Sequence, residues 1–297
     1  MTARKVVGLG ELLWDLFPAG RKLGGAPANF AYISDLLGAQ GIVASRVGKD
    51  ELGREATDRV KALSVLTREV QVDAEHPTGM VKVSLDAAGQ AKFEITESVA
   101  WDYLEWTPEW KQLAMNCAAV CFGSLAQRSP QSRNTIQSFV REAKPSALCV
   151  FDVNLRQHFY CKETLQSSVE LAHIVKLNHE ELPVVTGLLG FEGGNEKQSA
   201  GWLQREFDLR LVCVTRGSQG SLMQSASETH EYPGFRVKIV DTVGAGDAFT
   251  AAMTQHFLRG SSLAQMSEAA NRVGAWVASQ AGGTPVPDEE TLRALKS

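Results

Sequence analysis

Short apolar segments alternate with amphipathic segments along most of the 297 residues. The apolar segments have the length of buried strands, and the stretches between them repeat apolar residues at helical spacing. We expect strands at 5–10, 42–47, 118–122, 147–152, 174–178 and 211–215. We expect helices at 28–37, 53–63, 130–143, 164–172 and 197–207. Because strands that alternate with helices form parallel sheets covered on both faces, the pattern predicts an α/β fold with a mostly parallel central sheet.

Two segments depart from this pattern. Residues 79–85 and 91–96 alternate apolar and polar side chains on either side of a turn at 86–90, as the strands of a hairpin do. Together with residues 12–18, they predict a small antiparallel sheet that stands off the main one. Such a sheet would serve as a lid, as a dimer contact, or as both, because its edge strands are open to pairing.

The composition argues against several classes of protein. Hydrophobic residues make up 44% of the chain and charged residues 22%, as in an ordinary soluble globular protein. The formal net charge is −4 and no block of Lys and Arg stands out, so we expect no nucleic-acid partner. Apolar runs are too short for a signal peptide or a membrane span, which predicts a cytoplasmic protein without membrane contact. The five cysteines lie mostly in apolar segments and are expected as free thiols.

The strongest chemical signal is the segment from Asp241 to Asp247, which reads Asp-Thr-Val-Gly-Ala-Gly-Asp. A strand-like alternation at 235–240 precedes it, and a helical pattern at 247–258 follows. A glycine-rich turn at a helix N-terminus presents unpaired N–H groups and the positive end of the helix dipole, which attract phosphate. A carboxylate repels a phosphate, so Asp247 has two interpretations. It caps the helix, or it takes a proton from an attacking hydroxyl while the amides hold a phosphoryl group.

A second glycine cluster precedes the first long helical segment. Gly24 and Gly25 allow close approach of a ligand to the backbone, and Asn29 both donates and accepts hydrogen bonds. A polyhydroxy ligand requires both abilities. Taken alone, the cluster is equally typical of a Gly-Gly turn followed by an Asn cap.

The order and wide separation of the two clusters resemble the paired signatures of the ribokinase-like, or PfkB-type, carbohydrate kinases. Within that family, residues 8–18 and 151–156 are similar to the corresponding segments of bacterial fructokinases. The resemblance covers nearly the whole chain and implies a three-layer α/β sandwich with a small antiparallel β lid. It implies a single domain over residues 1–297, with lid strands inserted at about 11–26 and 72–98.

The resemblance also implies roles for single residues. Asp247 would be the general base, and the amides of Gly244, Ala245 and Gly246 would form the anion hole for the γ-phosphoryl group of ATP. The residues that would hold the sugar are Asp15, Gly24, Gly25, Asn29 and Arg156. The residues that would line the nucleotide site are Asn178, Thr215, Gly217, Gly220 and Asn271.

The same resemblance implies two sites for metal ions. Glu181 with Asn178 resembles the Asn-x-x-Glu element that organises Mg²⁺ and its waters near the phosphates. Asp241 and Val243 would contribute to a site for a monovalent cation such as K⁺, although residues 279–284 depart from the usual form. Helix capping is the competing interpretation for Asn178 and Glu181. For Arg156 the competing interpretation is a surface charge.

The implied activity is ATP-dependent phosphorylation of a sugar hydroxyl, with fructose converted to fructose 6-phosphate as the leading reaction. Ribose, a 2-keto-3-deoxy sugar acid or a nucleoside are alternative acceptors, and a non-catalytic sugar-binding protein is a remote alternative. A dinucleotide oxidoreductase is disfavoured because the segment after Gly8-Leu-Gly10 lacks the third glycine of the usual fingerprint. The implied partners are a small sugar and ATP, together with a second copy of the chain at the lid.

Overall fold

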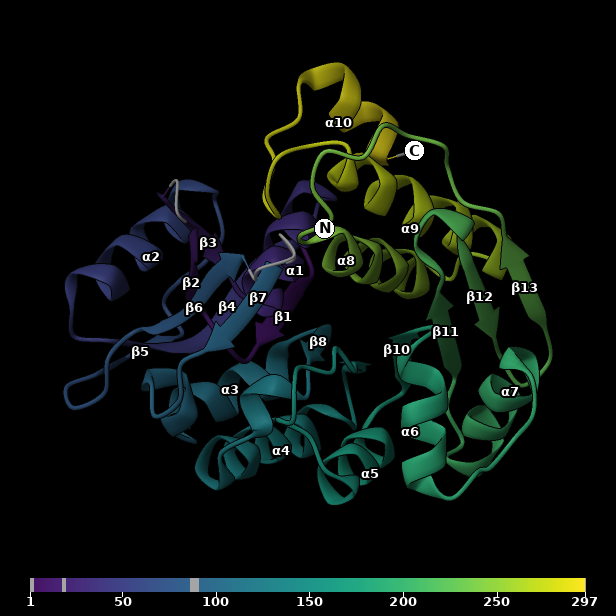
Figure 1. The fold of residues 1–297 in the computed structure, drawn as a ribbon, viewed down its shortest axis with the longest axis horizontal. Helices are drawn as coiled ribbons and strands as arrows, with labels where there is room; N and C mark the ends of the chain where they lie inside the picture. The colour runs from purple at the N-terminus through teal and green to yellow at the C-terminus, as the bar shows by residue number, and fades with distance from the viewer. Residues whose placement is uncertain (1–2, 18–19, 86–90, 297) are drawn as a thin grey trace.

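A nine-stranded sheet runs through the centre of the computed structural model, which describes residues 3–17, 20–85 and 91–296 (Figure 1). The strand order is β13-β12-β11-β10-β9-β8-β1-β4-β5. The strands are β1 (Lys5–Leu9), β4 (Gln40–Gly48), β5 (Val70–Asp73), β8 (Ala119–Phe122), β9 (Leu148–Asp152), β10 (Ile174–Asn178), β11 (Leu211–Thr215), β12 (Ser221–Gln224) and β13 (Thr229–Tyr232). All neighbours are parallel except β11–β12 and β12–β13, so the mostly parallel sheet is confirmed.

Helices cover both faces of this sheet, as the alternation predicts (Figure 1). One layer contains α1 (Ala26–Leu36), α2 (Glu51–Ala62), α8 (Ala245–Arg259), α9 (Leu263–Ala278) and α10 (Glu289–Lys296). The other contains α3 (Pro108–Asn116), α4 (Pro130–Ala143), α5 (Lys162–Leu171), α6 (Glu181–Leu189) and α7 (Glu196–Glu206). Successive strand residues point to opposite faces, so Val6 packs in the first layer and Val7 in the second. Both faces need apolar side chains, which explains the continuous apolar runs.

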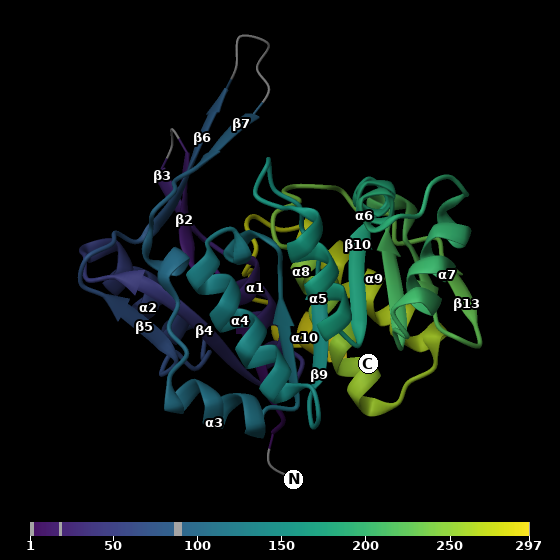
Figure 2. The ribbon, with the colours of Figure 1, turned by 90° about the horizontal axis from the view of Figure 1, so that it is seen from below.

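A second sheet of four strands, which we call the lid, has the order β3-β2-β6-β7. Its strands are β2 (Leu13–Phe17), β3 (Gly20–Gly24), β6 (Gly79–Leu85) and β7 (Ala91–Ile95). The pairs β2–β3 and β6–β7 are antiparallel as expected, whereas the central pair β2–β6 is parallel. The turn expected at 86–90 lies outside the described residues. Figure 2 shows β6 and β7 projecting well beyond the body of the molecule.

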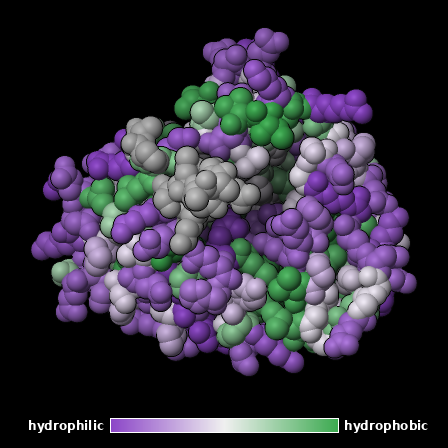
Figure 3. Space-filling model, in the orientation of Figure 1, coloured by the Kyte–Doolittle hydropathy of each residue, from purple (hydrophilic) through white to green (hydrophobic). Residues whose placement is uncertain are grey.

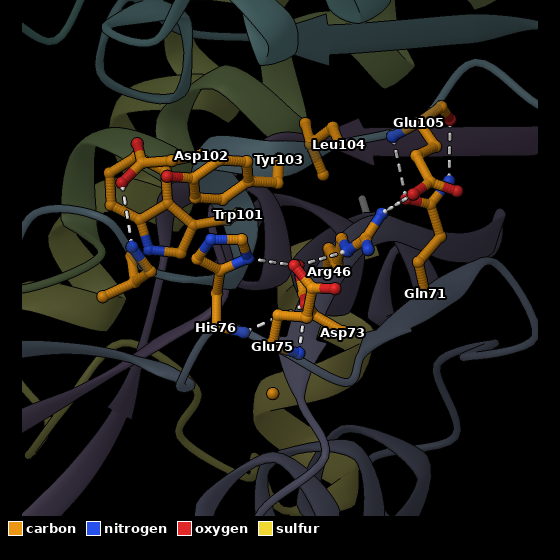
Figure 4. Close-up of polar contacts among 12 residues, drawn as sticks. Arg46, Gln71, Asp73, Glu75, His76, Trp101, Asp102, Tyr103, Leu104 and Glu105 are labelled. Atoms are coloured by element: carbon orange, nitrogen blue, oxygen red, sulfur yellow. Dashed lines mark hydrogen bonds and ion pairs between the residues drawn. The ribbon is translucent and has the colours of Figure 1, made fainter.

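The base of the lid is fixed to the main sheet by a polar cluster (Figure 4). Arg46 on β4 forms ion pairs with Asp73 at 2.9 Å and with Glu105 at 2.6 Å. Asp73 also accepts a hydrogen bond from the amide of His76 at 3.0 Å, and the His76 ring stacks on Tyr103 with 3.5 Å between ring centroids. Because Asp73 is buried, water screens its charge only weakly. The cluster therefore holds the chain at the point where it enters β6.

One expected strand is wrong. Residues 233–239 form no regular element, and the amides of Val240 and Asp241 bond to the carbonyl of Ala278 at the end of α9. Phe235, Arg236, Val237 and Ile239 instead line a cavity.

The structure also describes the state of the cysteines and the character of the helices. The cysteines are free thiols, of which four are buried and Cys161 is exposed. Among the described helices, none combines the length and the apolar character that crossing a bilayer requires.

Candidate active site

The fold brings the two glycine clusters together, because α1 and α8 pack side by side (Figure 1). The side-chain amide of Asn29, on α1, donates a hydrogen bond to Oδ2 of Asp247, on α8, at 2.8 Å. These two residues are 218 positions apart in the chain. Figure 3 shows this face of the molecule hollowed near its middle, with hydrophilic side chains at the bottom of the hollow.

Helix α8 begins directly after Gly244, whose φ of 76° lies in the left-handed region. A Cβ at this position would lie 2.4 Å from the Cα of Gly283, so only glycine fits. No side chain caps the helix, and the amide of Ala245 makes only a long bond of 3.3 Å to the carbonyl of Thr242. The first N–H groups of a helix lack helical acceptors and lie at its positive end. The turn is therefore built to hold an anion.

Asp247 lies in the first turn of α8 and is half-buried. Burial, together with the charge of Asp152, raises its pKa to about 6, while the bond from Asn29 and the charge of Lys176 act in the opposite direction. A carboxyl group with a pKa near 6 is ionised at neutral pH and accepts a proton readily there.

A buried ion pair lies beneath the glycine turn. Nζ of Lys176, on β10, lies 3.0 and 3.2 Å from the two carboxylate oxygens of Asp152, which also accept a bond from Thr250 at 2.7 Å. Burial lowers the pKa of Lys176, but the charges of Asp152, Glu181 and Asp247 outweigh this effect and raise it. Nζ lies 3.1 Å from where a Cβ on Gly246 would stand. The ammonium group of Lys176 therefore stays protonated and places a positive charge next to the anion-binding turn.

Glu11, Asp15 and Asp247 are three carboxyl groups of the site with raised pKa values. Burial raises the pKa of Glu11 to about 7 and that of Asp15 to about 6, so each resembles Asp247. The guanidinium group of Arg156 lowers the pKa of all three. Arg156 itself is exposed and donates a hydrogen bond to the carbonyl of Leu155 at 3.1 Å. Arg156 therefore acts on all three acids, together with Lys22 at Asp15 and Lys176 at Asp247.

The glycines of the first cluster let these acids approach the backbone. A Cβ on Gly24 would lie 2.4 Å from Oδ2 of Asp15, and a Cβ on Gly25 would lie 2.5 Å from the carbonyl oxygen of Glu11. Gly25 also has a φ of 114° and stands at the N-cap position of α1. Both positions therefore exclude a side chain.

A cavity of about 520 Å³ opens beside the glycine turn. It is lined by the five residues expected at the nucleotide site, namely Asn178, Thr215, Gly217, Gly220 and Asn271. Ala245 and Gly246 also line it, and Val237, Ile239 and Phe249 contribute apolar side chains. The volume is in the range of small-molecule sites, and apolar side chains next to an anion-binding turn suit a nucleotide.

Asn178 and Glu181 bind each other's backbone. The side-chain oxygen of Asn178 accepts bonds from the amides of Glu180 and Glu181, each at 2.8 Å. The carboxylate of Glu181 accepts bonds from the amides of Leu155 and Asn178, also at 2.8 Å. A carboxylate has about four acceptor positions, so two remain for water. These bonds close the turn that leads into α6, whose N-cap residue Glu180 makes no side-chain cap bond, and the remaining acceptor positions of Glu181 fit a water held by Mg²⁺.

Other metal ligands are sparse. Within residues 3–17, 20–85 and 91–296, no three His, Cys, Asp or Glu side chains form a cluster suited to a metal ion. The carboxylate of Asp241 accepts bonds from the amides of Val243 at 3.0 Å and Gly282 at 3.1 Å. It also lies 3.2 Å from the ammonium group of Lys22, on lid strand β3. A monovalent cation at Asp241 would compete with Lys22.

Two residues of the site, Glu11 and Lys176, have no role in the sequence-based prediction. Both had a visible signal. Glu11 is an acid directly after the apolar run 5–10, and Lys176 is a charge inside the apolar run 174–178. Ligands of parallel sheets bind beyond the carboxyl ends of the strands, which marks Glu11, just past the end of β1. Lys176 lies within β10, where a buried charge requires a partner.

Known proteins share this architecture. The model of the pfkB family carbohydrate kinases matches residues 18–290. A fructokinase from Escherichia coli is 29% identical over 272 aligned positions, gaps included, and the match covers 84% of this chain and 83% of that protein. Fructokinase-1 from Oryza sativa subsp. japonica is 30% identical over 320 aligned positions, gaps included, and the match covers 98% of each chain.

Solved structures match from end to end. The structure of an uncharacterized sugar kinase from Pyrococcus horikoshii has a TM-score of 0.84 and 27% identity, and the match covers 99% of this chain and 100% of that one. A fructokinase from Vibrio cholerae, solved in a fructose, ADP and calcium ion bound form, has a TM-score of 0.83 and 25% identity, with 100% and 99% covered. The three-layer sandwich with its small sheet is thus the ribokinase-like fold, and the chain belongs to the pfkB family of carbohydrate kinases.

Proposed function

We propose that this protein transfers the γ-phosphoryl group of ATP to a hydroxyl group of a neutral sugar, with fructose as the acceptor and fructose 6-phosphate as the product. One observation carries the proposal. Asp247 contacts Asn29 on the acceptor side, while its neighbour Gly246 lines the 520 Å³ cavity. A base at this point stands between a sugar and a nucleotide.

The chemistry needs few groups. Asp247 takes the proton of the sugar hydroxyl while the hydroxyl oxygen forms a bond to the γ-phosphorus of ATP. The bond between the γ-phosphorus and the bridging oxygen of the β-phosphate breaks, and ADP leaves. The amides of Gly244, Ala245 and Gly246 stabilise the charge on the transferring group, and one such donor is typically worth about 3 kcal/mol. The buried ammonium group of Lys176 adds positive charge beneath them. Bound Mg²⁺ would neutralise phosphate charge, with Glu181 holding one of its waters.

The charges on the acceptor side favour a neutral sugar. Glu11, Asp15 and Asp247 are three acids of the site, and Arg156 is the cation that acts on all three. A sugar acid would place another carboxylate among these acids, which like-charge repulsion disfavours. A neutral polyol instead supplies hydroxyl groups, which donate hydrogen bonds to the carboxylates. Like-charge repulsion therefore favours fructose and ribose over a 2-keto-3-deoxy sugar acid. The relatives named fructokinase favour fructose over ribose and nucleosides.

The remaining roles follow the same division of the site. Asp15, Gly24, Gly25, Asn29 and Arg156 hold the sugar, and the residues that line the cavity hold ATP. Asp241 and Val243 are the candidates for K⁺, which would displace the ammonium group of Lys22. The lid excludes water from the reaction, because water would otherwise replace the sugar as acceptor.

A coupled assay of ADP release tests the proposal. The purified protein is given ATP and Mg²⁺ with fructose, ribose, a 2-keto-3-deoxy sugar acid or a nucleoside at matched concentrations. We expect the highest kcat/KM with fructose. Turnover of the sugar acid or the nucleoside alone would overturn the choice of acceptor. Sugar binding by calorimetry without ADP release would instead support the non-catalytic alternative.

A further inference from the structure

Glu11 is a buried acid at the end of β1, and its side chain has few partners. The residue is 4% exposed, and Oε1 accepts a bond of 3.3 Å from the amide of Ala26, the first residue of α1. In the described part of the chain, Glu11 forms no ion pair, and the charge of Arg156 is the weakest of the influences on its pKa. A buried carboxylate without a cation destabilises a fold.

A cap of α1 does not require an acid. A glutamine side chain has the same shape, and its oxygen would accept the same bond from Ala26 without the cost of burying a charge. The carboxyl group is therefore poorly explained by the fold alone. Its chemistry differs from that of an amide in one useful respect, because a carboxylate accepts stronger hydrogen bonds from hydroxyl groups.

Glu11 also shares a cavity with the proposed base. A pocket of about 10 Å³ is bounded by the acids Glu11, Asp152 and Asp247, and most of its other lining residues are apolar, among them Pro27, Phe30, Cys121, Phe122 and Leu125. This volume is near the minimum that holds one water-sized group. A hydroxyl group placed there would share the pocket with both Glu11 and Asp247, and the charge of Asp247 is close enough to raise the pKa of Glu11.

We propose that Glu11 contacts the sugar directly, by accepting a hydrogen bond from a second hydroxyl group close to the one that Asp247 deprotonates. This inference rests on the proposed function and deepens it. Glu11 thereby selects acceptors that carry this hydroxyl group over the analogue that lacks it. The contact orients the sugar, and Asp247 performs the proton transfer.

The test compares Glu11→Gln and Glu11→Ala with the wild type, using fructose and its monodeoxy analogues. A charge-assisted hydrogen bond corresponds to a change of roughly 10- to 100-fold. We expect Glu11→Ala to raise the KM for fructose by this factor and leave the KM for ATP unchanged. One monodeoxy analogue should have the same KM with wild type and Glu11→Ala, because the contact is already missing. Glu11→Gln retains the bond to Ala26, and its KM for fructose should lie between the values of wild type and Glu11→Ala.

The control is Glu206→Gln, an exposed acid on α7 outside the site, which should behave as wild type. An unchanged KM for fructose in both Glu11 variants would overturn the inference. So would an equal loss for every analogue, which indicates a structural effect.

Calorimetry of fructose binding without ATP separates this inference from the proposed function. Weaker binding to the Glu11 variants, with no turnover by wild type, would support the contact and reject the kinase. Turnover by wild type, with equal fructose binding by wild type and both Glu11 variants, would support the kinase and reject the contact.

Discussion

At the scale of single residues, burial decides the acid strength of the site. Asp247 has a pKa of about 6 because burial and the nearby charge of Asp152 disfavour its ionised form. As a base it must be ionised before it can accept a proton. We therefore expect kcat/KM to rise with pH through about 6 and to level off near neutrality. A rate profile from pH 5 to 8 checks this, and a flat profile would contradict the role of Asp247.

The same effect at Glu11 predicts a change in stability. Its pKa is about 7 in the folded protein against 4.5 ordinarily, so the folded state retains a proton that the unfolded state releases between these values. The free energy of unfolding therefore falls as the pH rises from 4.5 to 7. The loss is on the order of 3 kcal/mol, since one pKa unit is about 1.4 kcal/mol.

Glu11→Gln removes this titration. We expect the variant to be more stable than wild type at pH 8, with a difference that shrinks toward pH 4.5. Urea unfolding of both proteins at several pH values measures the difference. A constant difference across the range would show that Glu11 does not titrate as described.

At the scale of elements, the turn before α8 depends on the absence of a side chain. In Gly244→Ala the new Cβ would meet the backbone of Gly283, and φ is positive as well, so the turn must shift. We expect kcat to fall by at least about 100-fold, as when an oxyanion-hole donor is lost. Gly187→Ala, in the open on α6, is the matched control and should retain full activity. Equal activity of the two variants would show that the turn does not hold the phosphoryl group.

The sequence predicted most elements, because buried strands and amphipathic helices each leave a clear period. The strand expected at 235–240 is wrong: its residues alternate in polarity, but the amides of Val240 and Asp241 bond to the carbonyl of Ala278 at the end of α9 and not to a strand. The antiparallel strands β12 and β13 were missed. β13 is only partly buried and lies at the edge of the sheet, so its apolar signal is weak.

At the scale of the whole molecule, the site is assembled from distant parts of the chain. Residues near both ends meet because α1 and α8 pack together, and no local pattern encodes that meeting. A family resemblance supplied it for Asn29 and Asp247. It did not supply Glu11 or the pair of Lys176 and Asp152. Charges next to or inside apolar runs are visible in the sequence, but the contacts of these residues follow only from burial and distances.

The lid and the hollow belong to this same scale. Lys22 on β3 contacts Asp241 just before the glycine turn, so the lid and the turn are joined across the site. The polar cluster around Arg46 fixes the other end of the lid to the main sheet. A sugar bound between these parts would be enclosed by the lid on one side and by α1 and α8 on the other.

The central claim is that Asp247 removes the proton of the acceptor hydroxyl. The most direct measurement is the kcat of Asp247→Asn for fructose and ATP, alongside calorimetry of both ligands. The amide keeps the shape of the side chain but cannot serve as the base. We expect both ligands to bind nearly as they do to wild type, while kcat falls by several orders of magnitude. A kcat close to that of wild type would contradict the account.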